Sequence, residues 1–172
     1  MPLHIVGFLL LIHVLTTRPL SAQGPSSLEW GRFIGYKDFQ ASAPQYDTAA
    51  ASISVTILLG YSSTKSGTLA FRVVAVMDKK QSWIKDEYKK DHILRHEQGH
   101  FDIAHIYAKK LEASLKLRQY TSRDTVALNH VYDRHLEEMN GRQIRYDVET
   151  KGGWDLLAQS KWRRIIAGEL RK

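Results

Sequence analysis

The chain contains no cysteine and only four prolines among its 172 residues. The absence of cysteine excludes a disulfide framework and restricts any metal site to histidine and carboxylate ligands. A long hydrophobic run is also missing, because the most apolar stretch, residues 5–15, is shorter than the roughly 20 residues needed to cross a bilayer. Internal repeats and low-complexity tracts are absent too, which argues against a solenoid or a long disordered segment.

Positive charge is in moderate excess, with 25 Lys and Arg against 18 Asp and Glu and a net charge of +7. No basic run is interleaved with aromatic residues, as a nucleic-acid groove requires, so we do not expect nucleic acid as a partner. A basic surface suits anionic partners such as envelope lipid or a polyanionic substrate. Solvated Lys and Arg side chains are the simpler interpretation.

The first 22 residues are predicted to form an export signal. The apolar stretch is followed by a segment of helix-breaking and small residues, in which Ser21 and Ala22 give a cleavage point before Gln23. The remaining residues, 23–172, suffice for one compact domain, which we expect to be periplasmic or secreted and without stable membrane insertion. Because no Lys or Arg precedes the apolar stretch, a retained short anchor is the alternative.

Alternation with a period of two predicts β-strands in the first half of the chain. Residues 51–59 alternate Ile53, Val55 and Ile57 with small polar residues, and residues 69–77 repeat the pattern after a loop rich in serine and glycine. Residues 28–39, which are rich in aromatic side chains, suit a first strand and turn. Together these segments predict an N-terminal antiparallel hairpin or meander.

From about residue 89 the hydrophobic period changes to that of an α-helix. We expect one helix to about residue 117, a second helix that ends at Gly152 and Gly153, and a short third helix over residues 154–170. Gly141 is a weak point inside the second helix. Strands followed by helices predict an α+β fold for the whole domain.

The first helix carries an HExxH motif. His96 and His100 stand four residues apart, so their Cβ atoms lie about 6 Å apart on one face of the helix and both rings can reach one zinc ion. Glu97 falls beside the metal, where a carboxylate can take a proton from a zinc-bound water. His100 also begins a buried stripe that continues through Ala104, Ala108, Leu111 and Leu115. The motif predicts a zincin-like domain, with two structural histidines as the alternative.

The second helix is expected to bring further polar groups to the metal. A short connection makes two helices antiparallel neighbours, and a turn centred near Tyr120 places His96 opposite Ile144 and His100 opposite Asn140. The segment that follows supplies the candidates for a third ligand or a transition-state donor, namely Gln143, Tyr146, Asp147 and Glu149. We expect the third ligand to be Asp147 or Glu149, and Tyr146 to donate to the oxyanion of the transition state.

The other histidines fit the site less well. His105 points about 160° away from the direction of His96 and His100 on a continuous helix, and is expected at the surface or against the second helix. His92 lies one turn before His96, but three histidines on one straight stripe converge poorly on a tetrahedral ion. His135 is expected to be a hydrogen-bonded core residue, and Asp102 to orient a neighbouring segment or to be solvated.

The sequence resembles a bacterial family of exported proteins of unknown function that are described as predicted zinc-dependent proteases. The most specific match is HEQGHFDIA, followed by IYAKKL, and weaker matches are WGRFIGYKDFQ, AAASISV, QSWIK and RYDVET. The resemblance covers most of the mature chain and implies that His96 and His100 bind zinc and that Glu97 is the catalytic carboxylate. Two positions depart from the family pattern. Gly152 stands where a histidine is common, two residues after Thr150, and His105 stands where an acidic residue is common.

Two functions follow from these patterns. The first is an exported zinc metallohydrolase, a peptidase that uses a zinc-bound water activated by Glu97 and acts on a peptide or protein substrate. The alternative is a non-catalytic zinc-binding or scaffold protein of the cell envelope that has lost the usual third ligand at Gly152. A membrane-surface adaptor that uses the basic C-terminal segment KWRRIIAGELRK is a weaker third possibility.

Overall fold

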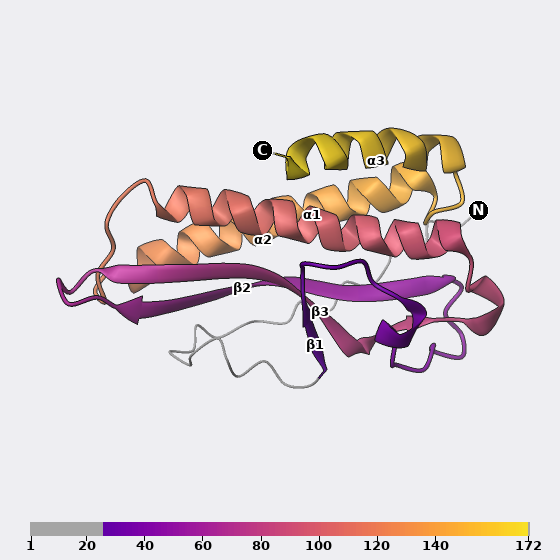
Figure 1. Cartoon of the computed structure of the whole chain (residues 1–172), viewed down its shortest axis with the longest axis horizontal. Helices are drawn as coiled ribbons and strands as arrows, with labels where there is room; N and C mark the ends of the chain where they lie inside the picture. Colours follow the sequence, from indigo (N-terminus) through magenta and orange to yellow (C-terminus); the bar gives the residue numbers. More distant parts are fainter. Residues whose placement is uncertain (1–25, 172) are drawn as a thin grey trace.

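The computed structural model describes residues 26–171, so the predicted export signal, residues 1–22, lies outside the described residues. A three-stranded antiparallel sheet forms one layer, and three helices are stacked on one face of it (Figure 1). This arrangement confirms the α+β prediction. Within residues 26–171, no helix has both the length and the apolar composition that crossing a membrane requires.

The sheet consists of β1 (Ser27–Glu29), β2 (Ala51–Ser63) and β3 (Leu69–Ile84), in the order β1-β3-β2. The β2–β3 hairpin confirms the pairing predicted from the period-two pattern, and both strands extend beyond the predicted ranges. The register shifts between Ser52 and Ser54. The apolar residues Ile53 and Ile57 are buried in the core, as a strand with one buried face requires.

The prediction of a first strand and turn over residues 28–39 is confirmed in part, because the strand covers only the start of that segment. Only Ser27–Glu29 pairs with β3, and the chain then leaves the sheet and reaches a short 3-10 helix, η2 (Tyr36–Asp38). The reason is that side chains, not a neighbouring strand, bind its backbone. The N–H of Ile34 donates to the Gln98 side chain, and the N–H of Gly35 donates to Asp38.

The helices are α1 (Asp91–Leu115), α2 (Thr125–Thr150) and α3 (Leu156–Leu170), and the 3-10 helix η3 (Asp86–Tyr88) precedes α1. The carboxylate of Asp155 caps α3 by accepting from the N–H of Ala158. The helix α1 lies along the sheet, and its predicted buried stripe is confirmed, since Ala104, Ala108, Leu111 and Leu115 all lie in the core.

The helices α1 and α2 are antiparallel neighbours, but their alignment differs from the prediction by about three residues. His100 contacts Gln143 rather than Asn140. The connection between the helices does not turn back directly, because its Tyr120 carbonyl accepts from the N–H of Leu69 at the start of β3. In this alignment His96 contacts Asp147 rather than Ile144.

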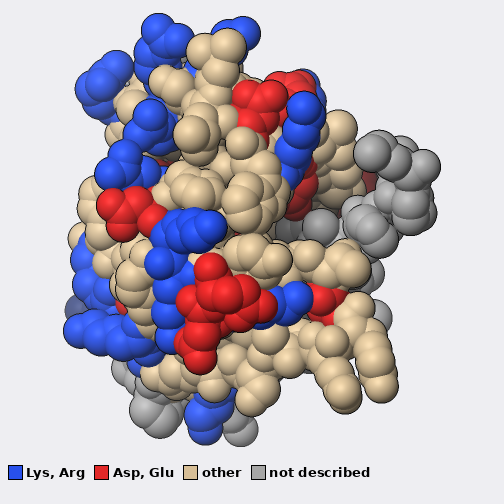
Figure 2. All heavy atoms as spheres, turned by 90° about the vertical axis from the view of Figure 1, so that its right-hand side faces the viewer, with Lys and Arg blue, Asp and Glu red and all other residues tan. Residues whose placement is uncertain are grey.

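Figure 2 shows the face of the molecule that lies on the right in Figure 1, and this face carries both positive and negative side chains. Basic side chains are most numerous along one margin of this face, and acidic side chains, several of them directly beside basic ones, gather near its middle. A mixed surface of this kind is typical of solvated charges.

Candidate metal centre

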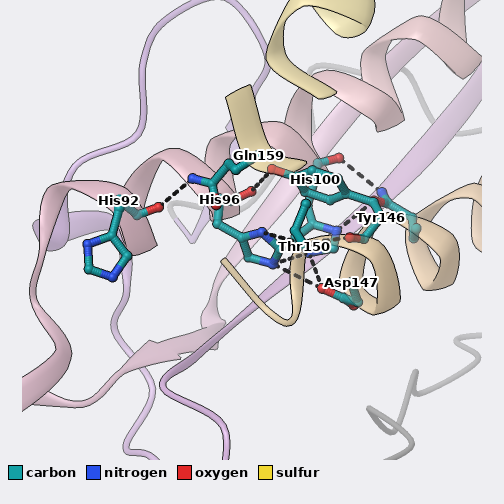
Figure 3. A network of polar contacts seen from close by, with 8 residues as sticks. His92, His96, His100, Tyr146, Asp147, Thr150 and Gln159 are labelled. Atoms are coloured by element: carbon teal, nitrogen blue, oxygen red, sulfur yellow. Dashed lines mark hydrogen bonds and ion pairs between the residues drawn. The ribbon is translucent and has the colours of Figure 1, made fainter. Parts of the chain in front are cut away.

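Three side chains from two helices converge near the N-terminal end of α1. Nε2 of His96 and Nε2 of His100 lie 3.1 Å apart. Oδ1 of Asp147, which projects from α2, lies 3.0 Å from the first nitrogen and 2.9 Å from the second. The three atoms therefore form a nearly equilateral triangle (Figure 3). His96 and His100 are buried, whereas Asp147 is partly exposed.

The second nitrogen of His100 is held by Gln143. Its Nδ1 lies 2.6 Å from Oε1 of Gln143, whose Nε2 donates to the His100 carbonyl at 2.9 Å. The second bond fixes the orientation of the amide, so the oxygen faces Nδ1 and must accept its proton. A neutral His100 therefore has its free lone pair on Nε2, which is the nitrogen in the triangle.

Thr150 holds the second nitrogen of His96 in the same way. Its hydroxyl donates to the Tyr146 carbonyl at 2.6 Å, so the oxygen is left to accept from Nδ1 of His96 at 3.3 Å. The lone pair of Nε2 is again directed into the triangle. Two imidazole lone pairs and a carboxylate oxygen thus meet at about 3 Å, an arrangement that requires a shared proton or a metal ion between them. The group His96, His100 and Asp147 could hold a metal ion.

Without a metal ion, burial and the charge of Asp147 determine the protonation of the two histidines. Burial lowers the pKa of His100, but the negative charge of Asp147, with its hydrogen bond, outweighs burial and raises the pKa to about 9. Burial lowers the pKa of His96 to about 4 despite the same carboxylate. The pair therefore carries one proton at neutral pH. Burial raises the pKa of Asp147, but the two histidines hold it well below its ordinary value.

Glu97 lies on the side of α1 that faces the sheet and is almost fully buried. Burial raises its pKa to about 7, and the charge of Asp147 adds to this rise. The charge of His100 and the backbone N–H of Ile53, at the start of β2, act in the opposite direction. Glu97 does not belong to the group of three possible ligands. Its pKa responds to the charges of His100 and Asp147, and its carboxyl group can exchange a proton near neutral pH.

Tyr146 has no exposed surface, and its ring stacks on His96 at a centroid distance of 4.7 Å. Its hydroxyl donates to the His96 carbonyl at 3.3 Å, and burial raises its pKa well above the ordinary value. Because the Tyr146 hydroxyl donates its proton to a backbone carbonyl, that proton is not directed at the metal centre. The geometry favours a role in positioning His96 over the predicted donation to an oxyanion.

Two glycines make room for this packing. A Cβ atom at Gly99 would lie 2.3 Å from the Tyr146 hydroxyl, and a Cβ atom at Gly153 would lie 2.9 Å from Cβ of His96. Gly153 also has a φ of 89°, which L-residues rarely adopt. Close approach of α2 and of the turn after it thus fixes the His96 ring from two sides.

Glu149, the other candidate third ligand, is not in the group. It is exposed and accepts from Nε1 of Trp162 at 2.7 Å, so it joins α2 to α3. Gly152 is also absent from the group. It lies in the turn after α2 with a φ of 61°, and a Cβ atom there would contact nothing within 4 Å. Asp147 thus provides the third possible ligand atom in place of the histidine that the family resemblance led us to expect at Gly152.

The remaining histidines lie elsewhere. The ring of His92 points away from the triangle toward Trp154, and that of His105 stacks on Trp30 at 3.7 Å (Figure 3). His105 therefore packs against the segment after β1, not against α2. His130 is exposed, and His135 is buried with hydrogen bonds to Ser114 and to the Val131 carbonyl, as a core histidine requires.

Asp102 orients a neighbouring segment, which was one of the two roles expected for it; the other was a solvated side chain. It accepts from Trp30 at 2.8 Å and from Gln98 at 2.7 Å, and Gln98 in turn accepts from the N–H of Ile34. Gln98 was not foreseen, although it lies inside the HExxH motif. Gln159, which with Trp162 belongs to the closing block of the family resemblance, donates its amide to the His92 carbonyl and ties α3 to α1.

A comparison with protein families identifies the family of this chain. The model of a family described as a bacterial protein of unknown function (DUF922) matches residues 16–153, a span that contains the three strands, α1, α2 and all three possible metal ligands. No curated protein and no solved structure matches the chain. The resemblance noted in the sequence is thereby confirmed for the family and not for its description as proteases. The chain belongs to this bacterial family of unknown function.

Proposed function

We propose that this protein is an exported zinc-dependent hydrolase that cleaves peptide bonds. His96, His100 and Asp147 are its metal ligands, and Glu97 is its general base. The observation that carries the proposal is the triangle of two imidazole nitrogens and one carboxylate oxygen. A fourth ionisable group, Glu97, follows His96 in the chain, and its pKa responds to the charges of His100 and Asp147. Export rests on residues 1–22 and stays a prediction.

The spacing of the ligand atoms supports zinc. Ligand atoms at about 2.0–2.1 Å from a tetrahedral ion lie about 3.3 Å from one another. The three distances in the protein, 3.1, 3.0 and 2.9 Å, need only a small expansion to reach that value. Calcium and magnesium prefer sites made entirely of oxygen atoms, so the two imidazoles argue against both. Only three residues among the described His, Cys, Asp and Glu side chains form the group, and three protein ligands are typical of catalytic rather than structural zinc sites.

The environment of each group suits hydrolysis. When bound, zinc supplies a Lewis acid that polarises a carbonyl group and makes water more acidic. Glu97 accepts the proton of the attacking water and passes it to the leaving amine, and a pKa of about 7 suits both transfers. Gln143 and Thr150 hold the two imidazole rings in the required tautomers, so the ligands need no rearrangement.

The test is Glu97→Gln, which preserves the shape of the side chain and removes its ability to take a proton. We expect zinc content and thermal stability to be retained and peptide cleavage to fall by at least about 100-fold, the usual scale of general acid–base catalysis. Glu138→Gln is the matched control, because Glu138 is exposed on α2 away from the ligands. It should leave all three quantities unchanged.

Zinc content after dialysis and cleavage of a broad peptide library, measured side by side, decide the matter. Wild-type protein that binds zinc but cleaves nothing above the Glu97→Gln background would refute the hydrolase. The non-catalytic zinc-binding scaffold would then be the remaining function. Protein that binds no zinc would refute both.

A further inference from the structure

The helix α3 has one side that is exposed along its length. It is the outermost layer of the fold, where it packs on α1 and α2 (Figure 1). Its buried residues, Gln159, Trp162 and Ile166, share one side of the helix, because they are spaced by three and four residues. The opposite side of α3 is not covered by any element among residues 26–171. We call this side the outer face of α3.

The outer face of α3 carries positive charge that is not neutralised within the fold. The exposed cations that form no ion pair with any residue among 26–171 are Lys161, Arg163, Arg164 and Arg171. The two acidic residues of this segment act elsewhere, since Asp155 caps α3 and Glu169 accepts two hydrogen bonds from Arg142. Figure 2, in which α3 lies uppermost as in Figure 1, shows basic side chains along the top of the molecule and acidic side chains below them. This face therefore attracts an anionic surface.

Large apolar side chains are exposed where the chain turns from α2 into α3. Trp154, Leu156 and Leu157, which we call the apolar corner, have exposed fractions of 49%, 59% and 68%. Neighbouring exposed apolar side chains are typical of a binding surface. The Trp154 ring also contacts Tyr88 edge to face, and Nζ of Lys90 lies 5.8 Å from its centroid. Aromatic rings beside lysine ammonium groups are typical of the boundary between a membrane and water.

We propose that the outer face of α3 and the apolar corner bind the surface of an anionic lipid bilayer. The cations contact the phosphate headgroups, and the apolar corner enters the boundary between headgroups and acyl chains. The other occupants match only one of these features. A nucleic acid offers phosphates but no apolar layer for two leucines, and a second copy of the same face would bring like charges together.

The apolar corner adjoins the metal centre. A Cβ atom at Gly153, the residue before Trp154, would lie 2.9 Å from Cβ of His96. The Trp154 ring itself lies 5.4 Å from the ring of His92, one helical turn before His96. A protein bound through this corner holds its metal centre close to the membrane, so its substrates are polypeptides at the same surface. This consequence rests on the proposed function, whereas membrane binding itself does not.

The first experiment measures sedimentation of the zinc-loaded protein with lipid vesicles. One set of vesicles contains phosphatidylglycerol and phosphatidylethanolamine, and the other contains only phosphatidylcholine, which has no net charge. We expect binding to the anionic vesicles that weakens as the salt concentration rises, and little binding to the neutral ones. No binding to the anionic vesicles, or equal binding to both sets, would overturn the proposal.

The second experiment tests the cations. A cation near an anionic membrane contributes about fivefold in affinity, so the double variant Arg163→Gln/Arg164→Gln should bind anionic vesicles about 25-fold more weakly. The control is Arg123→Gln/Arg134→Gln, which has the same net charge and changes two exposed arginines outside α3. It should bind nearly as the wild type does. Equal losses in the two double variants would show that net charge, not the outer face of α3, causes the binding.

The third experiment tests the apolar corner. The double variant Leu156→Gln/Leu157→Gln keeps every charge and should lose about tenfold in affinity for anionic vesicles. The control is Leu117→Gln/Val126→Gln, because these side chains are even more exposed and lie outside α3. Unchanged binding of the first variant would refute insertion into lipid and would leave a site for soluble polyanions. A wild-type dimer that the first variant dissociates would show that a second copy covers this face.

The failures of the two proposals look different. Glu97→Gln should bind anionic vesicles as tightly as the wild type, because membrane binding does not use the base. Cleavage of peptides that depends on Glu97, without vesicle binding, leaves the hydrolase and removes the membrane surface. Vesicle binding that depends on α3, without cleavage by the wild type, leaves the membrane surface and removes the hydrolase.

Discussion

Replacing Asp147 by asparagine tests whether this carboxylate is the third metal ligand. The substitution keeps the size of the side chain and exchanges an anionic oxygen, 2.9–3.0 Å from the two imidazole nitrogens, for a neutral amide. Structural zinc sites with four ligands contribute about 10–16 kcal/mol, or about 2.5–4 kcal/mol for each ligand. Loss of one ligand should therefore weaken zinc binding by about 100- to 1,000-fold.

Thermal unfolding with and without zinc measures this loss. At a free zinc concentration of about 1,000 times the wild-type Kd, binding stabilises the wild type by about 4 kcal/mol, whereas a variant weakened 100-fold gains about 1.4 kcal/mol. For a chain of this size, 1 kcal/mol shifts the Tm by about 2–4 °C. Zinc should thus raise the Tm by about 8–16 °C in the wild type and by about 3–6 °C in Asp147→Asn.

Glu149→Gln is the matched control, because Glu149 lies two residues away on the same helix and binds Trp162 instead of the histidines. Its zinc-induced Tm shift should equal that of the wild type. A full shift in Asp147→Asn, or a lost shift in Glu149→Gln, would show that the assignment of the third ligand is wrong.

Two further predictions concern packing and pH. Gly99→Ala should lower stability by about 1–3 kcal/mol, because its Cβ would lie 2.3 Å from the Tyr146 hydroxyl, whereas Gly141→Ala, which meets nothing within 4 Å, should raise stability by about 0.4–1 kcal/mol. Urea unfolding of the two variants checks this, and equal effects would contradict it. Zinc binding at pH 8 should release about one proton, because His100, with a pKa of about 9, is still protonated there, whereas Glu97, with a pKa of about 7, is mostly ionised. Zinc affinity should consequently rise with pH up to about 9, and calorimetry in buffers of different ionisation enthalpy that shows no proton release would refute the shared proton.

Local periodicity predicted the parts of the fold that are local. The alternation around Ile53 and Ile57 predicted the hairpin, and the four-residue spacing of His96 and His100 predicted two adjacent nitrogens on one helix face. Both patterns depend only on the geometry of a single element. The path of the segment after β1 was not predicted, because it depends on contacts with a distant element. Its aromatic residues resemble a strand, but the backbone N–H of Ile34 is bound by the side chain of Gln98 on α1, 64 residues away.

The third ligand position shows where sequence reasoning reaches its limit. Antiparallel pairing of α1 and α2 was enough to narrow the choice to a few polar residues, but not to distinguish Asp147 from Glu149. That distinction depends on the angle of each side chain around α2, and this angle depends on how α2 packs. Gln143 and Tyr146 are fully buried and mark the side of α2 that packs on α1. Asp147 lies at the border between this buried side and solvent, where its carboxylate reaches the histidines. Glu149 lies two residues further round the helix and faces α3.

A third ligand supplied by a second helix follows from the straightness of α1. Successive turns of one helix lie about 5.4 Å apart along its axis, so His92 could not join His96 and His100 around one ion without bending the helix. A group from α2 can approach at the same height as the two histidines. Metal binding then joins α1 to α2 at the point where Gly99 allows them to approach most closely.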